Sequence, residues 1–95
     1  MSENNRRHIR HEIQIDVNIT FVDNSVHVMQ TRDLSEGGMF IITSNENDVE
    51  FPLGEMVHLN YLNPLDDNEE TDVDAIIVRI MQDGVGLAFV DLAAF

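Results

Sequence analysis

Residues 73–89 read VDAIIVRIMQDGVGLAF and predict two antiparallel strands joined by a tight turn. Before the turn, the segment from Val73 to Met81 is rich in β-branched residues, which favour strands. After the turn, apolar residues alternate with small ones from Val85 to Phe89, and this period of two is typical of a half-buried strand. Between them, Asp83-Gly84 is a signal for a type I′ hairpin, in which both central residues need positive φ. The stretch therefore predicts antiparallel β-structure.

The same signals recur towards the N-terminus. Apolar and polar residues alternate over nine positions from Ile13 to Phe21, and the Asp23-Asn24-Ser25 that follows is turn chemistry. Further strands are predicted at residues 26–32, 39–43 and 56–62, and solvated acidic loops at residues 44–50 and 63–72. Six short strands with turns between them and no convincing helix predict a barrel or a sandwich. Closure into a barrel would also remove exposed strand edges.

The composition excludes several classes of function. The chain has 18 Asp and Glu residues against five Arg and no Lys, a formal net charge of -13. Proteins that bind duplex DNA or RNA neutralise many phosphates with a basic face, which five arginines cannot build among these acids. The same charge repels an anionic membrane surface. With no Cys, disulfides and thiolate chemistry are excluded, and no catalytic set of side chains is found at a meaningful spacing, so the sequence predicts no enzyme.

The length and the hydropathy pattern predict one soluble domain. Ninety-five residues are typical of a single domain. No stretch approaches the roughly 20 apolar residues of a membrane span. The polar residues 1–5 are followed by no apolar run, so no signal peptide is predicted. We therefore expect a cytoplasmic protein.

Three of the five arginines lie close together near the N-terminus, at Arg6, Arg7 and Arg10. Guanidinium groups bind phosphates, and the O6 and N7 edge of guanine, through paired hydrogen bonds. In so acidic a chain, this cluster predicts one local site for a small anion. The alternative is a basic tail that binds nothing specific, since short basic runs are common.

A second segment, Asp33-Leu34-Ser35-Glu36-Gly37-Gly38, offers complementary chemistry. The Asp33 carboxylate is suited to accept hydrogen bonds from the N1–H and N2–H₂ groups of guanine. The Ser35 hydroxyl is suited either to a phosphate or to holding the turn. Gly38 allows positive φ and a close approach of another backbone. Taken alone, the segment is also an ordinary turn, because Asp, Ser and Gly are the usual turn residues.

In this order and at this spacing, the two segments resemble the motifs of the PilZ domain, the bacterial receptor for cyclic di-GMP. The family pattern is RxxxR, then roughly twenty to thirty residues, then (D/N)xSxxG. Arg6-x-x-x-Arg10 and Asp33-x-Ser35-x-x-Gly38 match it at every defined position. The closing residues 84–92 also look like the last barrel strand of the family.

The resemblance implies an all-β fold, a six-stranded antiparallel β-barrel of the split-barrel type. It divides the chain into a flexible arginine arm, residues 1–10, and a barrel domain, residues 11–95. Family members usually continue into a C-terminal helix, which we expect to be short or absent because only residues 91–95 follow the last strand.

The resemblance also implies a binding site for cyclic di-GMP. Arg6 and Arg10 are expected to contact the phosphates and guanine, with Arg7 as a helper. Asp33 and Ser35 are expected to contact guanine and hold the site. The full expected set is Arg6, Arg7, Arg10, Asp33, Ser35, Gly37 and Gly38.

The implied function is a receptor or adaptor in signal transduction. Binding of cyclic di-GMP, a ligand and not a cofactor, is expected to change the arm and to relay the signal to an unidentified partner protein. We expect a monomer or homodimer that neither binds DNA or RNA nor inserts into membranes. The alternative is a PilZ-fold interaction module that binds no nucleotide. Both motifs are intact here, whereas non-binding members typically lack the arginines, and this favours the receptor.

Two other groups of residues invite comparison with metal sites. His8 and His11 flank the arm, but surface histidines are the more ordinary interpretation. Asp66-Asp67 and Glu69-Glu70 lack the glycine-bearing ligand loop of an EF-hand, so they predict a solvated loop. We therefore predict no metal site. Arg32, next to Asp33, is expected either near the ligand or in a surface salt bridge that contributes little.

Overall fold

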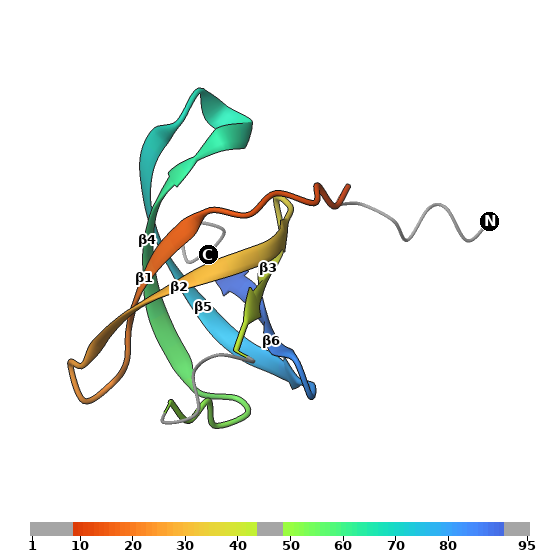
Figure 1. Cartoon of the computed structure of the whole chain (residues 1–95). Helices are drawn as coiled ribbons and strands as arrows, with labels where there is room; N and C mark the ends of the chain where they lie inside the picture. The colour runs from red at the N-terminus through yellow and green to blue at the C-terminus, as the bar shows by residue number, and fades with distance from the viewer. Residues whose placement is uncertain (1–8, 44–48, 91–95) are drawn as a thin grey trace.

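A computed structural model describes residues 9–43 and 49–90 of the chain. Within these residues the strands are antiparallel and close into a barrel in the order β1-β2-β3-β6-β5-β4 (Figure 1). The strands are β1 (Asp16–Thr20), β2 (Val26–Leu34), β3 (Gly38–Ile42), β4 (Met56–Asn63), β5 (Glu69–Ile80) and β6 (Gly84–Val90). The predicted six-stranded antiparallel β-barrel is confirmed, and the sandwich is excluded. Residues 91–95, and with them the expected short or absent C-terminal helix, lie outside the described residues.

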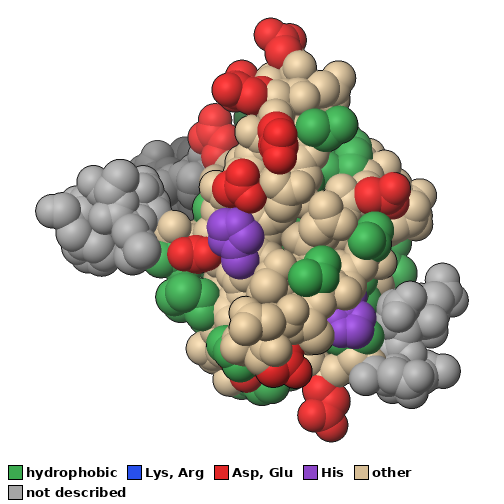
Figure 2. All heavy atoms as spheres, turned by 90° about the vertical axis from the view of Figure 1, so that its left-hand side faces the viewer, with side chains coloured by type: hydrophobic (Ala, Val, Ile, Leu, Met, Phe, Trp, Pro, Cys, Tyr) green, Lys and Arg blue, Asp and Glu red, His purple; other side chains and the backbone are tan. Residues whose placement is uncertain are grey.

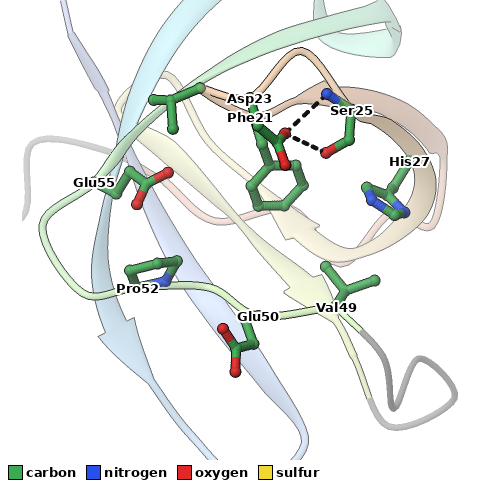
Figure 3. A pocket seen from close by; sticks show the side chains of 9 residues that line it. Phe21, Asp23, Ser25, His27, Val49, Glu50, Pro52 and Glu55 are labelled. Atoms are coloured by element: carbon green, nitrogen blue, oxygen red, sulfur yellow. Dashed lines mark hydrogen bonds between the residues drawn. The ribbon is translucent and has the colours of Figure 1, made fainter.

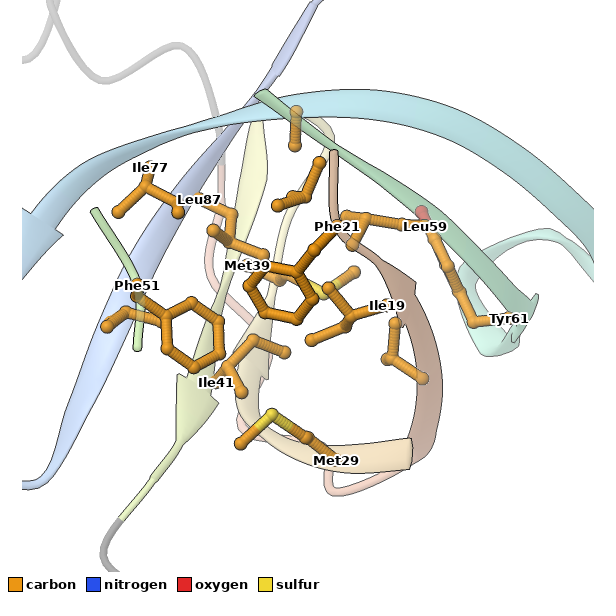
Figure 4. Packing of buried hydrophobic residues seen from close by; sticks show 14 of the residues in the cluster. Ile19, Phe21, Met29, Met39, Ile41, Phe51, Leu59, Tyr61, Ile77 and Leu87 are labelled. Carbon is orange, nitrogen blue, oxygen red and sulfur yellow. The ribbon is translucent and has the colours of Figure 1, made fainter. Parts of the chain in front are cut away.

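The alternation of apolar and polar residues places the core inside the barrel. On β1, Val17 and Ile19 are fully buried, whereas Asp16 and Asn18 are exposed. Figure 4 shows Ile19 among apolar side chains that converge from the other strands. Each such side chain contributes about 1.5–3 kcal/mol when fully buried. The hydrophobic effect therefore fixes which face of each strand points inward.

The N-terminal strand is shorter than predicted, because a buried threonine replaces part of its ladder. β1 begins at Asp16, not at Ile13. The Thr31 hydroxyl donates to the Ile13 carbonyl oxygen at 2.6 Å and accepts from the Ile15 amide at 3.1 Å. The Thr31 amide donates to the Ile15 carbonyl at 3.0 Å. Residues 13–15 therefore follow β2 without forming a regular strand.

The second acidic loop was predicted to run to residue 72, and this was wrong for its last part. β5 already begins at Glu69, after a short 3-10 turn, η2 (Pro64–Asp66). Asp67 and Asn68 have φ of 55° and 59°, so they reverse the chain in the left-handed region. The carboxylates at the start of β5 obscured the alternation of apolar and polar residues that is typical of a strand. They are tolerated because their side chains face water while Ala75 and Ile77 point into the core.

The predicted type I′ turn at Asp83-Gly84 was also wrong. Neither residue has positive φ, and the Met81 amide donates to the Gly84 carbonyl at 2.8 Å, which makes Gln82 and Asp83 the central residues. Gly84 is instead the first residue of β6. A Cβ at this position would overlap the Phe40 ring and the Ile41 carbonyl oxygen. Gly84 is therefore needed for close packing against β3 and not for the turn.

Candidate functional site

The segment Asp33–Gly38 joins the end of β2 to the start of β3. The Ser35 amide donates to the Gly38 carbonyl at 2.9 Å, and the Ser35 hydroxyl donates to the same oxygen at 3.3 Å. The Gly37 amide donates to the Ser35 hydroxyl at 3.2 Å. Of the two uses of this hydroxyl predicted from the sequence, the structure therefore shows the one that holds the turn.

Gly38 sits where two strands come very close. A Cβ on Gly38 would overlap the carbonyl oxygen of Leu87 in β6, whereas its φ is not positive. The Gly37 carbonyl accepts from the Phe89 amide at 2.9 Å. Of the two reasons given for a glycine here, only the close backbone approach applies.

The root of the arginine arm is fixed beside this turn. His11 and Leu34 form an antiparallel pair through two backbone hydrogen bonds of 2.9 Å. In an antiparallel pair, the residue before one partner lies opposite the residue after the other. Exposed Arg10 therefore lies next to Ser35. Arg6, Arg7 and His8 lie outside the described residues.

Asp33 is the residue before the last in β2, where the strand is irregular. The register between β2 and β3 shifts between Thr31 and Asp33, which marks a bulge at Arg32. The Asp33 side chain is only 11% exposed, and its Oδ2 accepts from the Arg32 Nε at 3.2 Å. A bulge re-aims side chains, and here it places Asp33 beside the arm root while Leu34 stays in the core.

The Arg32 guanidinium lies over an aromatic ring that the sequence analysis did not single out. Its Cζ is 3.8 Å from the centroid of the Phe40 ring. Met39 and Ile41 belong to the core, so alternation turns Phe40 to the outer face of β3. The signal for an outward aromatic was present in the sequence as the middle residue of Met39-Phe40-Ile41. No signal in the sequence indicated that Arg32 covers this ring, because Arg32 comes from another strand.

A different face of the barrel is unsuited to an anion. Figure 2 shows acidic side chains and histidine on the face that carries β4, with no Lys or Arg among the described side chains in view. His58 bonds to Asp74 at 2.8 Å and to Asp72 at 3.1 Å, across β4 and β5. A ligand with two phosphates would be repelled here.

The His58 contacts make a testable prediction about stability and pH. The hydrogen bonds to Asp74 and then to Asp72 raise the pKa of His58 above its ordinary value of 6.5. A raised pKa in the folded chain means that the stabilisation is fully present below pH 6.5 and is lost as the pH rises through the folded pKa. Because the His58 side chain is 46% exposed, the effect should be at most about 1 kcal/mol.

Urea denaturation of the native chain and of His58→Gln checks this prediction. The difference in unfolding free energy between the two should be larger at about pH 5.5 than at about pH 8.5. The reason is that the imidazole favours folding through its ion pairs only when it is protonated. Comparing the two proteins cancels the titration of the other histidines. A difference that does not change with pH would contradict it.

A pocket beside the β1–β2 hairpin is equally unsuited to phosphate. Figure 3 shows Phe21 and His27 on one side and the segment from Val49 to Glu55 on the other. Its lining includes the carboxylates of Asp23, Glu50 and Glu55 and no Lys or Arg. In Figure 1 this hairpin lies far from the β2–β3 turn. The structure thus separates the pocket from the expected site residues.

The part of the chain that the structure describes contains neither a group of side chains suited to a metal ion nor a helix suited to span a membrane. Among residues 9–43 and 49–90, no group of three or more His, Asp or Glu side chains has an arrangement that could hold a metal ion. Those residues also contain no helix long and apolar enough to cross a bilayer.

Comparison with known proteins agrees with the β-barrel fold. The family model of the PilZ domain matches residues 4–94. The inhibitor of motility MotI/DgrA of Bacillus subtilis superposes with a TM-score of 0.76 at 20% identity, over 94% of this chain and 44% of that one. The PilZ domain of CeSA from a cellulose-synthesizing bacterium superposes with a TM-score of 0.67 at 23% identity, over 90% and 85%. These likenesses show the fold, and the chain spans less than half the length of MotI/DgrA. A search of curated proteins finds no match.

Proposed function

Because this chain belongs to the PilZ domain family, we propose that it is a receptor for cyclic di-GMP that relays the signal to a partner protein. The observation that carries the proposal is the His11–Leu34 pair. It brings Arg10 next to Ser35 and within two residues of Asp33 along the strand. This pairing supports a site in which a cation for phosphate lies near an acceptor for the guanine edge, on a chain that is otherwise strongly acidic.

The arginines, Asp33 and Ser35 have different roles in this proposal. Arg10, with Arg6 and Arg7 from the arm, binds the phosphates through charge-assisted hydrogen bonds. Asp33 accepts from the N1–H and N2–H₂ groups of guanine. Ser35 keeps the turn closed. The contacts of its hydroxyl with Gly37 and Gly38 support this role.

We place the conformational response in residues 1–10, the arm, with the barrel domain as residues 11–95. Thr31 and Leu34 tie residues 11–15 to β2, so the barrel side of this junction is anchored. When its arginines bind the ligand, the arm is held against the β2–β3 turn, at a cost in conformational entropy that the new hydrogen bonds offset. A change of this kind alters the surface that a partner protein meets, and such order transitions are an established type of switch.

The proposed activity is binding and signal transduction in the cytoplasm, without catalysis. Cyclic di-GMP is the ligand of the site and not a cofactor. The partner is a protein, and the acidic faces of the barrel make DNA and RNA poor partners.

Calorimetric titration of the native chain with cyclic di-GMP tests the proposal. We expect saturable binding and a rise in melting temperature, since a ligand at 100 times its Kd stabilises the folded state by about 2.7 kcal/mol. GMP should bind more weakly, because it offers only one of the two nucleotide halves. A folded chain that gives neither heat nor a thermal shift would contradict the receptor and favour the interaction module that binds no nucleotide.

A further inference from the structure

Arg32 is held on three sides by residues from different elements. Its Nε lies 3.2 Å from Asp33 Oδ2, its Cζ lies 3.8 Å from the Phe40 ring centroid, and its NH1 lies 3.8 Å from Asp83 Oδ2 in the β5–β6 turn. The contact with Phe40 is a cation–π interaction, in which a planar guanidinium lies over the ring. Although 47% of the side chain is exposed, these three contacts restrain the guanidinium group.

The platform beneath Arg32 is itself rigid. Phe40 is only 6% exposed, and its ring packs over Gly84 at a position where a Cβ would overlap it. Gly86 is the cross-strand partner of Phe40 on β6. The ring therefore fills the space that a side chain on Gly84 would need, and Arg32 covers it from outside. This packing explains why residue 84 has no side chain.

Arg32 in turn orients the Asp33 carboxylate. It occupies one oxygen, Oδ2, through its Nε. The other oxygen, Oδ1, has no hydrogen-bond partner among residues 9–43 and 49–90, although the side chain is only 11% exposed. Because Oδ2 is held by Arg32, Oδ1 is the carboxylate oxygen that is available to a ligand. Because the arginine of this ion pair is half exposed, the pair contributes little to stability, and its main effect is on geometry.

We propose that Arg32 is a positioning residue for guanine recognition. Fixed on Phe40, it holds Asp33 so that Oδ1 faces the guanine edge, and it thereby sets the preference for guanine over other bases. The inference rests on the proposed function of the site. It differs from a direct contact between Arg32 and phosphate, because such a contact would strengthen the binding of every cyclic dinucleotide alike.

The test compares two ligands that differ in one donor group. Cyclic di-IMP keeps the phosphates and the N1–H group of cyclic di-GMP but lacks the N2 amine, so the ratio of the two affinities measures recognition of that amine. The native chain should prefer cyclic di-GMP. In Arg32→Ala and in Arg32→Lys, which keeps the charge but loses the planar group, the preference should fall about tenfold, the factor that corresponds to roughly one hydrogen bond.

Arg79→Ala is the matched control, since Arg79 is another exposed arginine, on β5 beside Gly86. It should leave the preference unchanged, and thermal unfolding should show all variants folded. An unchanged preference in Arg32→Ala, or an equal loss of affinity for both ligands, would overturn the positioning role while the receptor stands. If the native chain binds neither ligand, the proposed function itself fails.

Discussion

Replacing Arg10 with alanine is expected to weaken cyclic di-GMP binding by about 2–5 kcal/mol, a loss of thirtyfold or more in Kd. Arg10 is the described arginine next to the His11–Leu34 pair, which fixes the arm root on the barrel. Because two backbone hydrogen bonds hold this root, the Arg10 backbone is kept near the Ser35 turn in the chain without ligand. The truncation would leave a phosphate without its charged donor.

Calorimetry on Arg10→Ala and on Arg79→Ala measures the effect. Both variants remove one positive charge from an exposed position, so the net charge changes equally. Only Arg10→Ala should lose most of its affinity. Equal, small losses in the two variants would mean that the arginines act through net charge, and would argue against a defined site at the arm root.

Gly38→Ala is expected to destabilise the fold by about 3 kcal/mol or more, at the upper end of the range for overpacked positions. The new Cβ would overlap the Leu87 carbonyl oxygen, which belongs to the β3–β6 ladder. Backbone atoms in a closed barrel cannot move aside as a flexible side chain can. The melting temperature should therefore fall by roughly 10 °C or more.

Thermal and urea unfolding of Gly38→Ala and Gly86→Ala check this expectation. Gly86 is the matched control in the neighbouring strand, because a Cβ there would lie 3.4 Å from the Arg79 Cβ, an ordinary contact. The free energy of unfolding of Gly86→Ala should lie within about 1 kcal/mol of that of the native chain. If Gly38→Ala has the same melting temperature as Gly86→Ala, the close approach of β3 and β6 is not what requires a glycine at residue 38.

Much of the fold was visible in the sequence because strand patterning is local. The alternation from Ile13 to Phe21 has a period of two, and Val17 and Ile19 are indeed buried. The turn at Asp23-Asn24-Ser25 was predicted from residue type alone, and Asn24 has φ of 71° while Asp23 Oδ1 accepts from the Ser25 amide at 2.9 Å. Such features depend on neighbours a few residues away.

The errors arose where a distant residue decides the local structure. β1 starts late because Thr31, on another strand, supplies hydrogen bonds to Ile13 and Ile15. Gly84 was assigned to the turn, yet its lack of a side chain serves the Phe40 ring. No local pattern carries this information, since it depends on which strands become neighbours when the barrel closes.

The features of the candidate site also fall into those that the sequence predicts and those that depend on the fold. By itself, the sequence determined the all-β class, the order of the strands along the chain and, through RxxxR and DxSxxG, the family. Only the tertiary structure decided that the arm root pairs with Leu34 and that Arg32 lies between Asp33, Phe40 and Asp83. Residue types and spacings are properties of the linear chain, whereas these contacts join segments whose register is set by burying one shared core.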